Sequence, residues 1–134
     1  MENLKRDGIY TLVSRKVKSN DAVMFDIDDT LIFTNDQPNT PIIELLKIAQ
    51  YLGYKIVIIT ARSGLKQVVE WTIRQLASYN ISYDYLGFTS AQTKIQMKRE
   101  LPYNFILSVG DMPTDLTGSP YALNISNSYH NSGN

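Results

Sequence analysis

The segment DAVMFDIDDTLIF (residues 21–33) decides how the rest of this chain is interpreted. It begins as an apolar run typical of a buried strand, and Asp26, Asp28 and Asp29 crowd around its end. Two carboxylates about 4 Å apart repel each other by roughly 4 kcal/mol at an effective dielectric constant near 20. The cluster therefore needs a compensating group, which is either a bound cation or a strongly raised carboxyl pKa.

Composition limits the classes of protein to which the chain can belong. Its 134 residues are 43% hydrophobic and 19% charged, which is typical of one globular domain with a single core. The net charge is zero, so no overall field attracts nucleic acid or an anionic membrane, although a local patch of charge still has room to do so. The absence of cysteine excludes disulfides, cysteine-ligated zinc and thiol nucleophiles.

The two ends of the chain carry few signals. The first residues, MENLKRDG, lack the apolar segment of a signal peptide, and no apolar run is long enough to span a membrane. We therefore expect a cytoplasmic protein without a membrane partner. We expect one domain over residues 1–134. Residues 1–20 form an N-terminal extension whose pattern fits either a strand or part of a helix, and residues 126–134 form a loose polar tail.

Short β-branched runs alternate with helical periodicity along the chain. The expected strands are 22–27, 55–60, 83–88, 104–110 and 121–125. The expected helices are 41–52, 64–78 and 91–101. This order is typical of right-handed βαβ crossovers. It predicts the α/β class: a Rossmann-like three-layer sandwich with a mainly parallel sheet.

Two helices carry more detailed expectations. For helix 41–52, Thr40 suits the N-cap, Pro41 the first turn and Gly53 the C-terminal cap. For helix 64–78, the apolar stripe predicted to face the core consists of Leu65, Val68, Val69, Ile73 and Leu76. Trp71 lies off that stripe, so we expect it to be partly buried at the helix edge, with a partner surface as the alternative.

Polar residues follow the ends of three expected strands. The first strand runs into Asp26 and Asp28, the second into Thr60, and the fourth into Asp111 and Asp115. The carboxyl ends of parallel strands share one edge of a sheet, so these four acids are predicted to share one crevice. Residues two apart on an extended chain face the same side, which pairs Asp26 with Asp28 and leaves Asp29 to the turn.

The chemistry of this acid group indicates a metal. Its ligands are all oxygens, without histidine or cysteine, and such donors suit a hard cation. A few carboxylates combined with waters and a substrate phosphate are the usual surroundings of protein-bound Mg²⁺. The sequence therefore predicts a divalent-metal site at this edge.

Three motifs now resemble those of the haloacid dehalogenase superfamily. FDIDDT (25–30) is similar to its first motif, IVIITAR (56–62) to its second and SVGDMPTD (108–115) to its fourth. Lys94 stands where the third motif places a lysine. The resemblance spans residues 22–125, in the right order, and implies the family's α/β fold.

The resemblance also implies roles for the acids. Asp26 would be the nucleophile that forms an aspartyl-phosphate, and Asp28 the general acid and base. Mg²⁺ would be held by the Asp26 carboxylate, the backbone carbonyl of Asp28, and Asp111 with Asp115. An aspartate at the second position favours the phosphatase branch over the dehalogenase branch, because only phosphoryl transfer needs that proton.

The resemblance further implies a set of phosphate-binding groups: Thr60, the neighbouring amide of Ala61, Lys94 and Thr30. Lys94 and Lys98 share a helix face, so either could be the motif lysine. A helix of a parallel α/β unit begins near the carboxyl edge of the preceding strand. Lys94 is thus nearer the crevice by about 6 Å of helical rise, and we choose it.

The expected function is that of an Mg²⁺-dependent phosphatase, acting on a phosphorylated substrate that the sequence does not identify. The segments after the first two motifs are too short for the cap domain that members of the family often carry. An open site suits a bulky substrate, such as a protein or a nucleic-acid end, or a second subunit acting as the lid. The alternatives are a phospho-accepting signalling domain and a non-catalytic binding domain. Arg62 is expected to be a structural ion-pair partner.

Overall fold

The computed structural model describes residues 1–126, and the expected loose tail lies almost wholly outside them. The elements are, in order, α1 (Glu2–Val13), β1 (Asp21–Phe25), α2 (Thr40–Leu52), β2 (Lys55–Thr60), α3 (Lys66–Ser78), β3 (Tyr85–Phe88), the 3₁₀ turn η1 (Ala91–Thr93), α4 (Lys94–Glu100), β4 (Asn104–Gly110), α5 (Pro113–Leu116) and β5 (Tyr121–Asn124).

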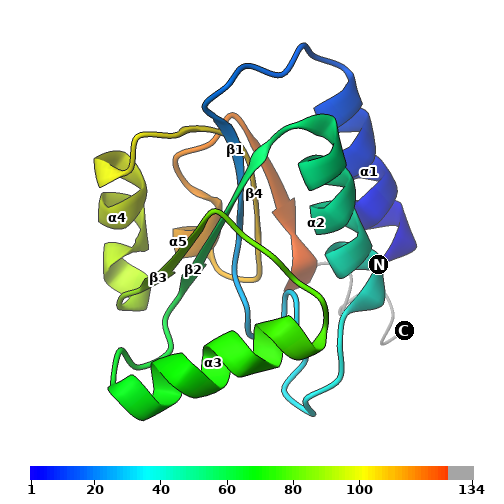
Figure 1. Ribbon diagram of the computed structural model, residues 1–134. Coiled ribbons are helices and arrows are strands. Elements are labelled where there is room, and N and C mark those ends of the chain that lie inside the picture. The colour runs from blue at the N-terminus through cyan, green and yellow to red at the C-terminus, as the bar shows by residue number, and fades with distance from the viewer. Residues whose placement is uncertain (127–134) are drawn as a thin grey trace.

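Within the described residues, five parallel strands form one sheet in the order β3-β2-β1-β4-β5. β1 is the central strand, and Phe25 pairs with Ile58 of β2 on one side and Val109 of β4 on the other. In Figure 1, α1 and α2 lie on one side of the sheet and α4 on the other. The predicted α/β class and parallel sheet are confirmed.

The side chains of β1 alternate between two apolar layers because successive residues of a strand face opposite sides. Val23 and Phe25 pack with α1 and α2, whereas Ala22 and Met24 pack on the side that Met97 of α4 covers. These four side chains are fully buried. This double burial explains why β1 reads as a continuous apolar run.

The ambiguous first residues form helix α1, which packs on α2. Gly8 makes the close approach possible, since a Cβ there would lie 2.7 Å from a methyl group of Leu45. The hydroxyl of Tyr54 donates a 2.7 Å hydrogen bond to the carbonyl of Leu12, which ties the end of α1 to the start of β2. The apolar run IYTLV is therefore helical, because its apolar face packs against another helix.

Several expected boundaries shift. β1 ends at Phe25 rather than at residue 27, and the expected helix 91–101 divides into η1 and α4. Gly53 adopts φ 102°, as a left-handed C-terminal cap should. Thr40 was wrong as N-cap: it is the first residue of α2, the cap position is Asn39, and no side chain caps the helix by a hydrogen bond.

Helix α3 buries less than its apolar stripe predicts. Only Thr72 and Leu76 are buried, whereas Leu65, Trp71 and Ile73 are exposed. Figure 1 shows the reason, because α3 lies crosswise at the end of the sheet where the strands finish. A helix in that position covers a sheet edge instead of a sheet face. Leu65 and Ile73 of its apolar stripe are therefore left without a covering layer.

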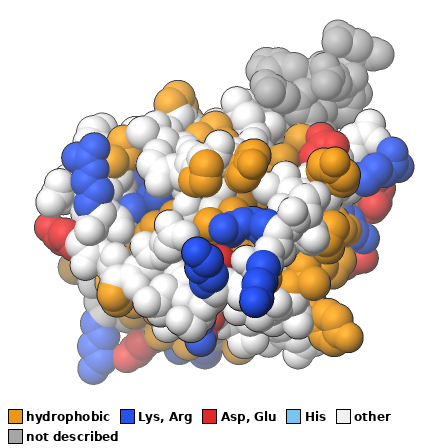
Figure 2. All heavy atoms as spheres, turned by 90° about the horizontal axis from the view of Figure 1, so that it is seen from above, with side chains coloured by type: hydrophobic (Ala, Val, Ile, Leu, Met, Phe, Trp, Pro, Cys, Tyr) orange, Lys and Arg blue, Asp and Glu red, His pale blue; other side chains and the backbone are white. Residues whose placement is uncertain are grey.

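The opposite edge, where the strands begin, has another character. The loop of residues 14–20 joins α1 to β1 there, and it carries Arg15, Lys16 and Lys18. Figure 2 views the molecule from this side and shows Lys and Arg side chains gathered near the middle of the face. No helix among residues 1–126 is long and apolar enough to cross a membrane.

Candidate active site

The end of β1 determines where the first acids point. The amide of Asp26 still donates to the carbonyl of Val109, at 3.0 Å, so this residue continues the pairing with β4. The chain then turns, because the carbonyl of Ile27 accepts the amides of Thr30, Leu31 and Ile32. Asp29 takes φ 59° in that turn, and its Oδ1 accepts the amide of Thr34 at 3.2 Å. Asp29 thus belongs to the turn, as expected.

Three acids converge at this edge. Carboxylate oxygens of Asp26, Asp111 and Asp115 all lie within 4.8 Å of one another, and Asp26 and Asp115 are buried. Nζ of Lys94 lies between two of them, 2.9 Å from Oδ1 of Asp26 and 2.6 Å from Oδ1 of Asp115. We call these four residues the acid–lysine cluster. It joins the ends of β1 and β4 with the start of α4.

Asp115 reaches the cluster because the residue five positions earlier, Gly110, has no side chain. A Cβ on Gly110 would clash with Cβ of Asp115. Oδ2 of Asp115 also accepts the amide of Met112 at 3.1 Å, which closes the short helix α5 onto the end of β4. The spacing Gly-Asp-x-x-x-Asp is therefore a requirement of packing as well as of chemistry.

The electrostatics of the cluster are unbalanced. Burial raises the pKa of Asp26 to about 8, and the Asp115 charge adds to the rise while Lys94 opposes it. Burial, with the Asp115 charge, also raises the pKa of Asp111. Burial lowers the pKa of Lys94, but Asp26 and Asp115 outweigh that effect, and the net pKa is raised. One lysine therefore compensates only part of the charge of three carboxylates.

This donor set fits a hard divalent cation. Three carboxylates supply only oxygen ligands, their ligand atoms already lie close together, and a single ammonium group leaves negative charge to be balanced. A raised carboxyl pKa is the response expected of crowded acids in the absence of such an ion. An acidic group able to hold a metal ion is therefore present at this edge of the sheet.

Asp28 is not one of the three carboxylates that could hold a metal together, although its spacing predicts that it pairs with Asp26. Arg62 holds it instead, through bonds of 3.1 Å from Nε and 2.8 Å from Nη2. β1 ends at Phe25 and a turn follows, so the alternation of a strand does not by itself fix the direction of the Asp28 side chain. The Asp28 side chain is 54% exposed, against 9% for its partner Arg62.

The sequence predicts only part of what Arg62 does at this edge of the sheet. Its remaining nitrogen, Nη1, donates to Thr72 at 3.1 Å and to Gln75 at 2.7 Å, so it ties α3 to Asp28. Its guanidinium also lies 5.0 Å from the ring centroid of Trp71. The ion pair was expected, but its link to the first motif was not. The available signal was its position two residues beyond Thr60, at the same sheet edge.

The expected phosphate-binding groups divide by burial. Thr60 and Thr30 are both fully buried, and the Thr30 hydroxyl finds no hydrogen-bond partner within the described residues. Oγ1 of Thr60 accepts the amide of Arg62 at 3.1 Å, while Ala61 is exposed. Direct contact of either hydroxyl with a substrate therefore requires some movement of its loop.

The two candidate lysines occupy different surroundings. Lys94 faces the acids, whereas Nζ of Lys98 donates to Oγ of Ser108 at 2.7 Å and to the carbonyl of Thr117 at 2.7 Å. Burial lowers the pKa of Lys98 to about 8, with the Asp115 charge opposing the change. Lys98 therefore fastens the chain after α5 to β4, and only Lys94 touches the acid cluster.

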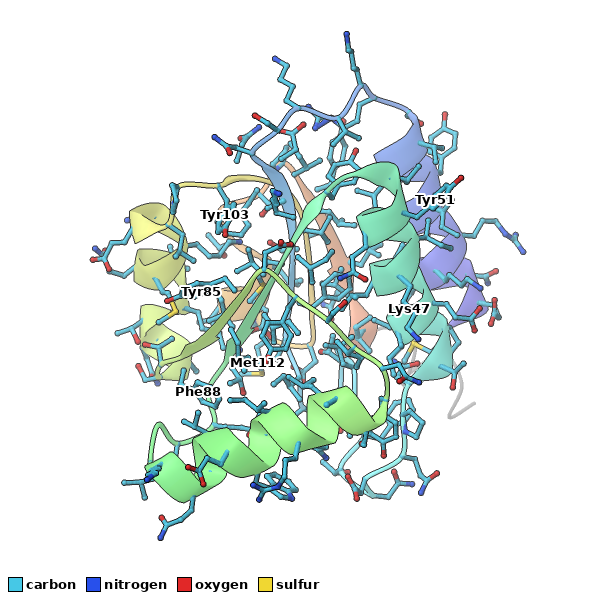
Figure 3. The ribbon with its side chains drawn as sticks, viewed as in Figure 1. Lys47, Tyr51, Tyr85, Phe88, Tyr103 and Met112 are labelled. Carbon is cyan, nitrogen blue, oxygen red and sulfur yellow. The ribbon has the colours of Figure 1, made fainter. Side chains whose placement is uncertain are left out.

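Other side chains surround this edge. Figure 3 shows Phe88 and Met112 at the end of the sheet that faces α3, whereas Tyr103 lies toward the opposite end and Tyr51 on α2. Met112 directly follows Asp111 and is 51% exposed. The surroundings of the acid cluster are thus partly apolar and open to solvent.

The segment 33–39 forms a flap beside α3. Gln75 donates to Oδ1 of Asp36 at 2.6 Å, and the hydroxyl of Tyr79 donates to the Asp36 carbonyl at 2.7 Å. Asp36 takes φ 66°, a left-handed conformation that aspartate tolerates better than most residues. The flap, α3 and Arg62 thus form one hydrogen-bonded assembly next to Asp28.

Comparison with known proteins finds similarity in structures alone, since neither a protein-family model nor a curated protein sequence matches the chain. In the structure of the Pnkp1/Rnl/Hen1 complex, one chain matches with a TM-score of 0.65 and 27% identity, over 73% of this chain and 41% of that one. In the Pnkp1/Rnl/Hen1 RNA repair complex, the values are 0.62 and 25%, over 72% and 37%. This chain therefore spans less than half the length of either.

The class C acid phosphatase from Bacillus anthracis also matches, with a TM-score of 0.66 and 18% identity over 88% of this chain and 65% of that one. At that identity the likeness shows the fold. The chain thus has the α/β fold of a known phosphatase and carries an acidic cluster, able to hold a metal, at the edge of the sheet where the strands end.

Proposed function

We propose that this chain is an Mg²⁺-dependent phosphatase of the haloacid dehalogenase superfamily, with a single catalytic domain. The observation that carries the proposal is the acid–lysine cluster, in which three strand-end carboxylates surround one buried lysine. The fold shared with an acid phosphatase, and the match of three sequence motifs, support the same assignment.

The chemistry proceeds in two balanced steps. A carboxylate oxygen of Asp26 attacks the phosphorus of a phosphomonoester, and the leaving oxygen takes a proton from Asp28. The product is an aspartyl-phosphate on Asp26. Asp28 then removes a proton from water, whose oxygen attacks the same phosphorus, so that inorganic phosphate leaves and the Asp26 carboxylate is restored.

The remaining residues position these groups. Asp26, Asp111 and Asp115, with the backbone carbonyl of Asp28, would hold Mg²⁺. The ion would supply positive charge to balance the carboxylates and polarise the phosphoryl group. Lys94 would hold the phosphoryl oxygens at the acid cluster, since its Nζ already lies between two of the acids.

The expected phosphate contacts of Thr60, Ala61 and Thr30 stay part of this proposal. The exposed amide region of Ala61 is the most accessible of them, whereas the two threonine hydroxyls are buried. Arg62 sets the direction of the Asp28 carboxylate through its two hydrogen bonds. Asp28 remains exposed enough to meet a leaving group or a water molecule.

A second candidate within the same chemistry is the removal of phosphate from a nucleic-acid end. The likeness to chains of the Pnkp1/Rnl/Hen1 RNA repair complex, at 25% and 27% identity, favours it. The loops that follow β1 and β2 are short, spanning residues 26–39 and 61–65. Neither loop has the length of a cap domain, which suits a macromolecular substrate or a second subunit acting as lid.

Phosphate release from p-nitrophenyl phosphate, with Mg²⁺ and with a chelator, tests the proposal. We expect turnover that requires the metal. A signalling domain would instead accept one phosphoryl group from acetyl phosphate without turnover, and a binding domain would do neither. Chemical trapping of the phosphorylated chain, followed by peptide mapping, should place the modification on Asp26, and any other site would overturn the mechanism.

A further inference from the structure

A pocket of about 310 Å³ lies between the flap and α3, outside the acid–lysine cluster. Its lining residues are Asp36, Trp71, Arg74, Gln75, Ser78 and Tyr79. Two aromatic side chains, one guanidinium and one carboxylate thus surround one small space. We call it the α3 pocket.

Contacts of one side chain, Arg62, link the α3 pocket to the candidate active site. Arg62 donates to Asp28 on one side, and its guanidinium lies over the ring of Trp71 on the other. Arg62 also donates to Gln75, which donates in turn to Asp36. The contacts that begin at Asp28 therefore lead through Arg62 to Trp71 and Gln75, which line the α3 pocket.

The exposure of these side chains is unusual for structural residues. Trp71 is 49% exposed although tryptophan is the largest apolar side chain, and Ile73 on the same helix is 43% exposed. Arg74 is exposed and forms no ion pair with the part of the chain that the structure describes. An exposed aromatic ring beside an unpaired cation is the combination that binds single-stranded nucleic acids.

We propose that the α3 pocket binds the nucleobase next to a terminal phosphate, so that the substrate is the phosphorylated end of a single-stranded nucleic acid. This inference rests on the proposed phosphatase function and specifies its substrate. The base stacks on Trp71, and Arg74 pairs with a backbone phosphate. The second oxygen of Asp36 accepts an exocyclic amino group, since its first oxygen is bound to Gln75.

Other phosphorylated substrates match the pocket less well. A sugar phosphate has no flat ring to stack on Trp71, and a phosphopeptide has no repeating phosphates for Arg74. The negative Asp36 also disfavours an anion inside the pocket, which directs the phosphate to Arg74 and leaves the interior to a neutral base. A nucleotide whose base carries an amino group offers a partner to each side chain: the ring to Trp71, the phosphate to Arg74 and the amino group to Asp36.

The first test uses fluorescence, because Trp71 is the only tryptophan of the chain. Titration of the wild-type protein with a single-stranded cytidine hexanucleotide that lacks a terminal phosphate should change the emission in a saturable manner. Ribose 5-phosphate should cause no such change at equal concentration. Emission that stays constant up to millimolar hexanucleotide would overturn the proposal, whether or not the protein is a phosphatase.

The second test compares two substrates in one variant. Trp71→Ala should lower kcat/KM for a hexanucleotide bearing a terminal phosphate, assayed in 3′- and 5′-phosphorylated forms, about tenfold more than for p-nitrophenyl phosphate. Arg74→Ala should give a smaller selective loss that shrinks as salt rises. Tyr51→Ala, a 90% exposed aromatic residue on α2, is the matched control and should change neither value.

The outcomes separate the two proposals. Equal losses on both substrates in Trp71→Ala and Arg74→Ala would show that the pocket does not select the substrate. Failure of the wild type to hydrolyse any phosphomonoester would instead overturn the phosphatase function, and the fluorescence titration would still report on the pocket. If Trp71→Ala does not fold, Arg74→Ala and the titration decide.

Discussion

The two ends of β1 each carry a buried aspartate, and the two residues behave in opposite ways. Asp21 is 1% exposed and Asp26 is 6% exposed. Asp21 accepts hydrogen bonds from the Lys18 amide at 2.8 Å and from Asn104 at 2.9 Å, and it pairs with Arg15 at 3.2 Å. Asp26 shares one lysine with Asp115 and lies close to the carboxylate of Asp111 as well.

The difference appears in their proton affinities. Burial raises the pKa of Asp21, but the Lys18 amide, Asn104 and Arg15 together outweigh burial, so the pKa is lowered. For Asp26, burial and the Asp115 charge dominate, and the pKa rises to about 8. A buried acid with donors on several sides is structural, whereas one crowded by like charges marks a site that awaits a ligand.

The largest expected effect comes from exchanging each acid for its amide. Asp26→Asn should lower kcat for p-nitrophenyl phosphate by about 10⁴-fold or more, because a carboxamide is a poor nucleophile. Asp21→Asn should leave kcat within about twofold and lower the free energy of unfolding by about 1–3 kcal/mol, since it removes acceptors from buried donors. Steady-state kinetics and urea unfolding measure both. Comparable losses of kcat in the two variants would show that Asp21 and Asp26 do not differ in their roles.

The next effect concerns the proton that Asp28 supplies. Asp28→Asn should lose about 10²–10⁴ in rate, the usual contribution of a general acid or base. The loss should be smaller for p-nitrophenyl phosphate than for an alkyl phosphate, because nitrophenolate leaves without protonation. Equal losses on the two substrates would assign Asp28 to positioning instead of acid catalysis in the first step.

A smaller effect is expected from the metal. Mg²⁺ should raise Tm, and a concentration 100 times Kd corresponds to about 2.7 kcal/mol of added stability. Asp111→Ala should remove most of this stabilisation, whereas Asp21→Asn should keep it, because only the first substitution takes a ligand away. Differential scanning fluorimetry measures the shifts. Equal shifts in wild type and Asp111→Ala would contradict the assigned ligands.

The smallest effect tests how far the field of the acids reaches along α4. Lys98 lies one turn beyond Lys94, and its pKa is lowered from the usual 10.5 to about 8. Between these two values the unfolded chain binds more protons than the folded chain, so the free energy of unfolding rises with pH. The slope is at most about 1.4 kcal/mol per pH unit for one group.

Urea unfolding between pH 7.5 and 10 should therefore show the wild type gaining stability relative to Lys98→Met, in which that titration is absent. Lys66→Met is the matched control, because it removes a lysine whose side chain is 88% exposed. A wild type whose stability stays constant relative to Lys98→Met over this range would mean that the folded chain keeps Lys98 charged, as the acids keep Lys94.

Much of this molecule follows from local patterns in the sequence. Strands buried on both faces need continuous apolar runs, so AVMF, KIVIIT and NFILSVG identify the core of the sheet without structural information. Helical rise alone distinguishes Lys94 from Lys98, and the structure places only Lys94 at the acids. The parallel order also brings strand ends together, which predicts that Asp26, Asp111 and Asp115 meet.

The tertiary structure decided what depends on exact chain direction and on long-range packing. Alternation along a strand predicts the direction of Asp28, but β1 ends at Phe25, and it is Arg62, from the end of another strand, that holds the Asp28 carboxylate. Apolar periodicity in α3 predicts a buried face, but a helix across a sheet edge leaves Leu65 and Ile73 of that face exposed. Periodicity reports which residues share a side of an element, and only the packed fold determines what that side meets.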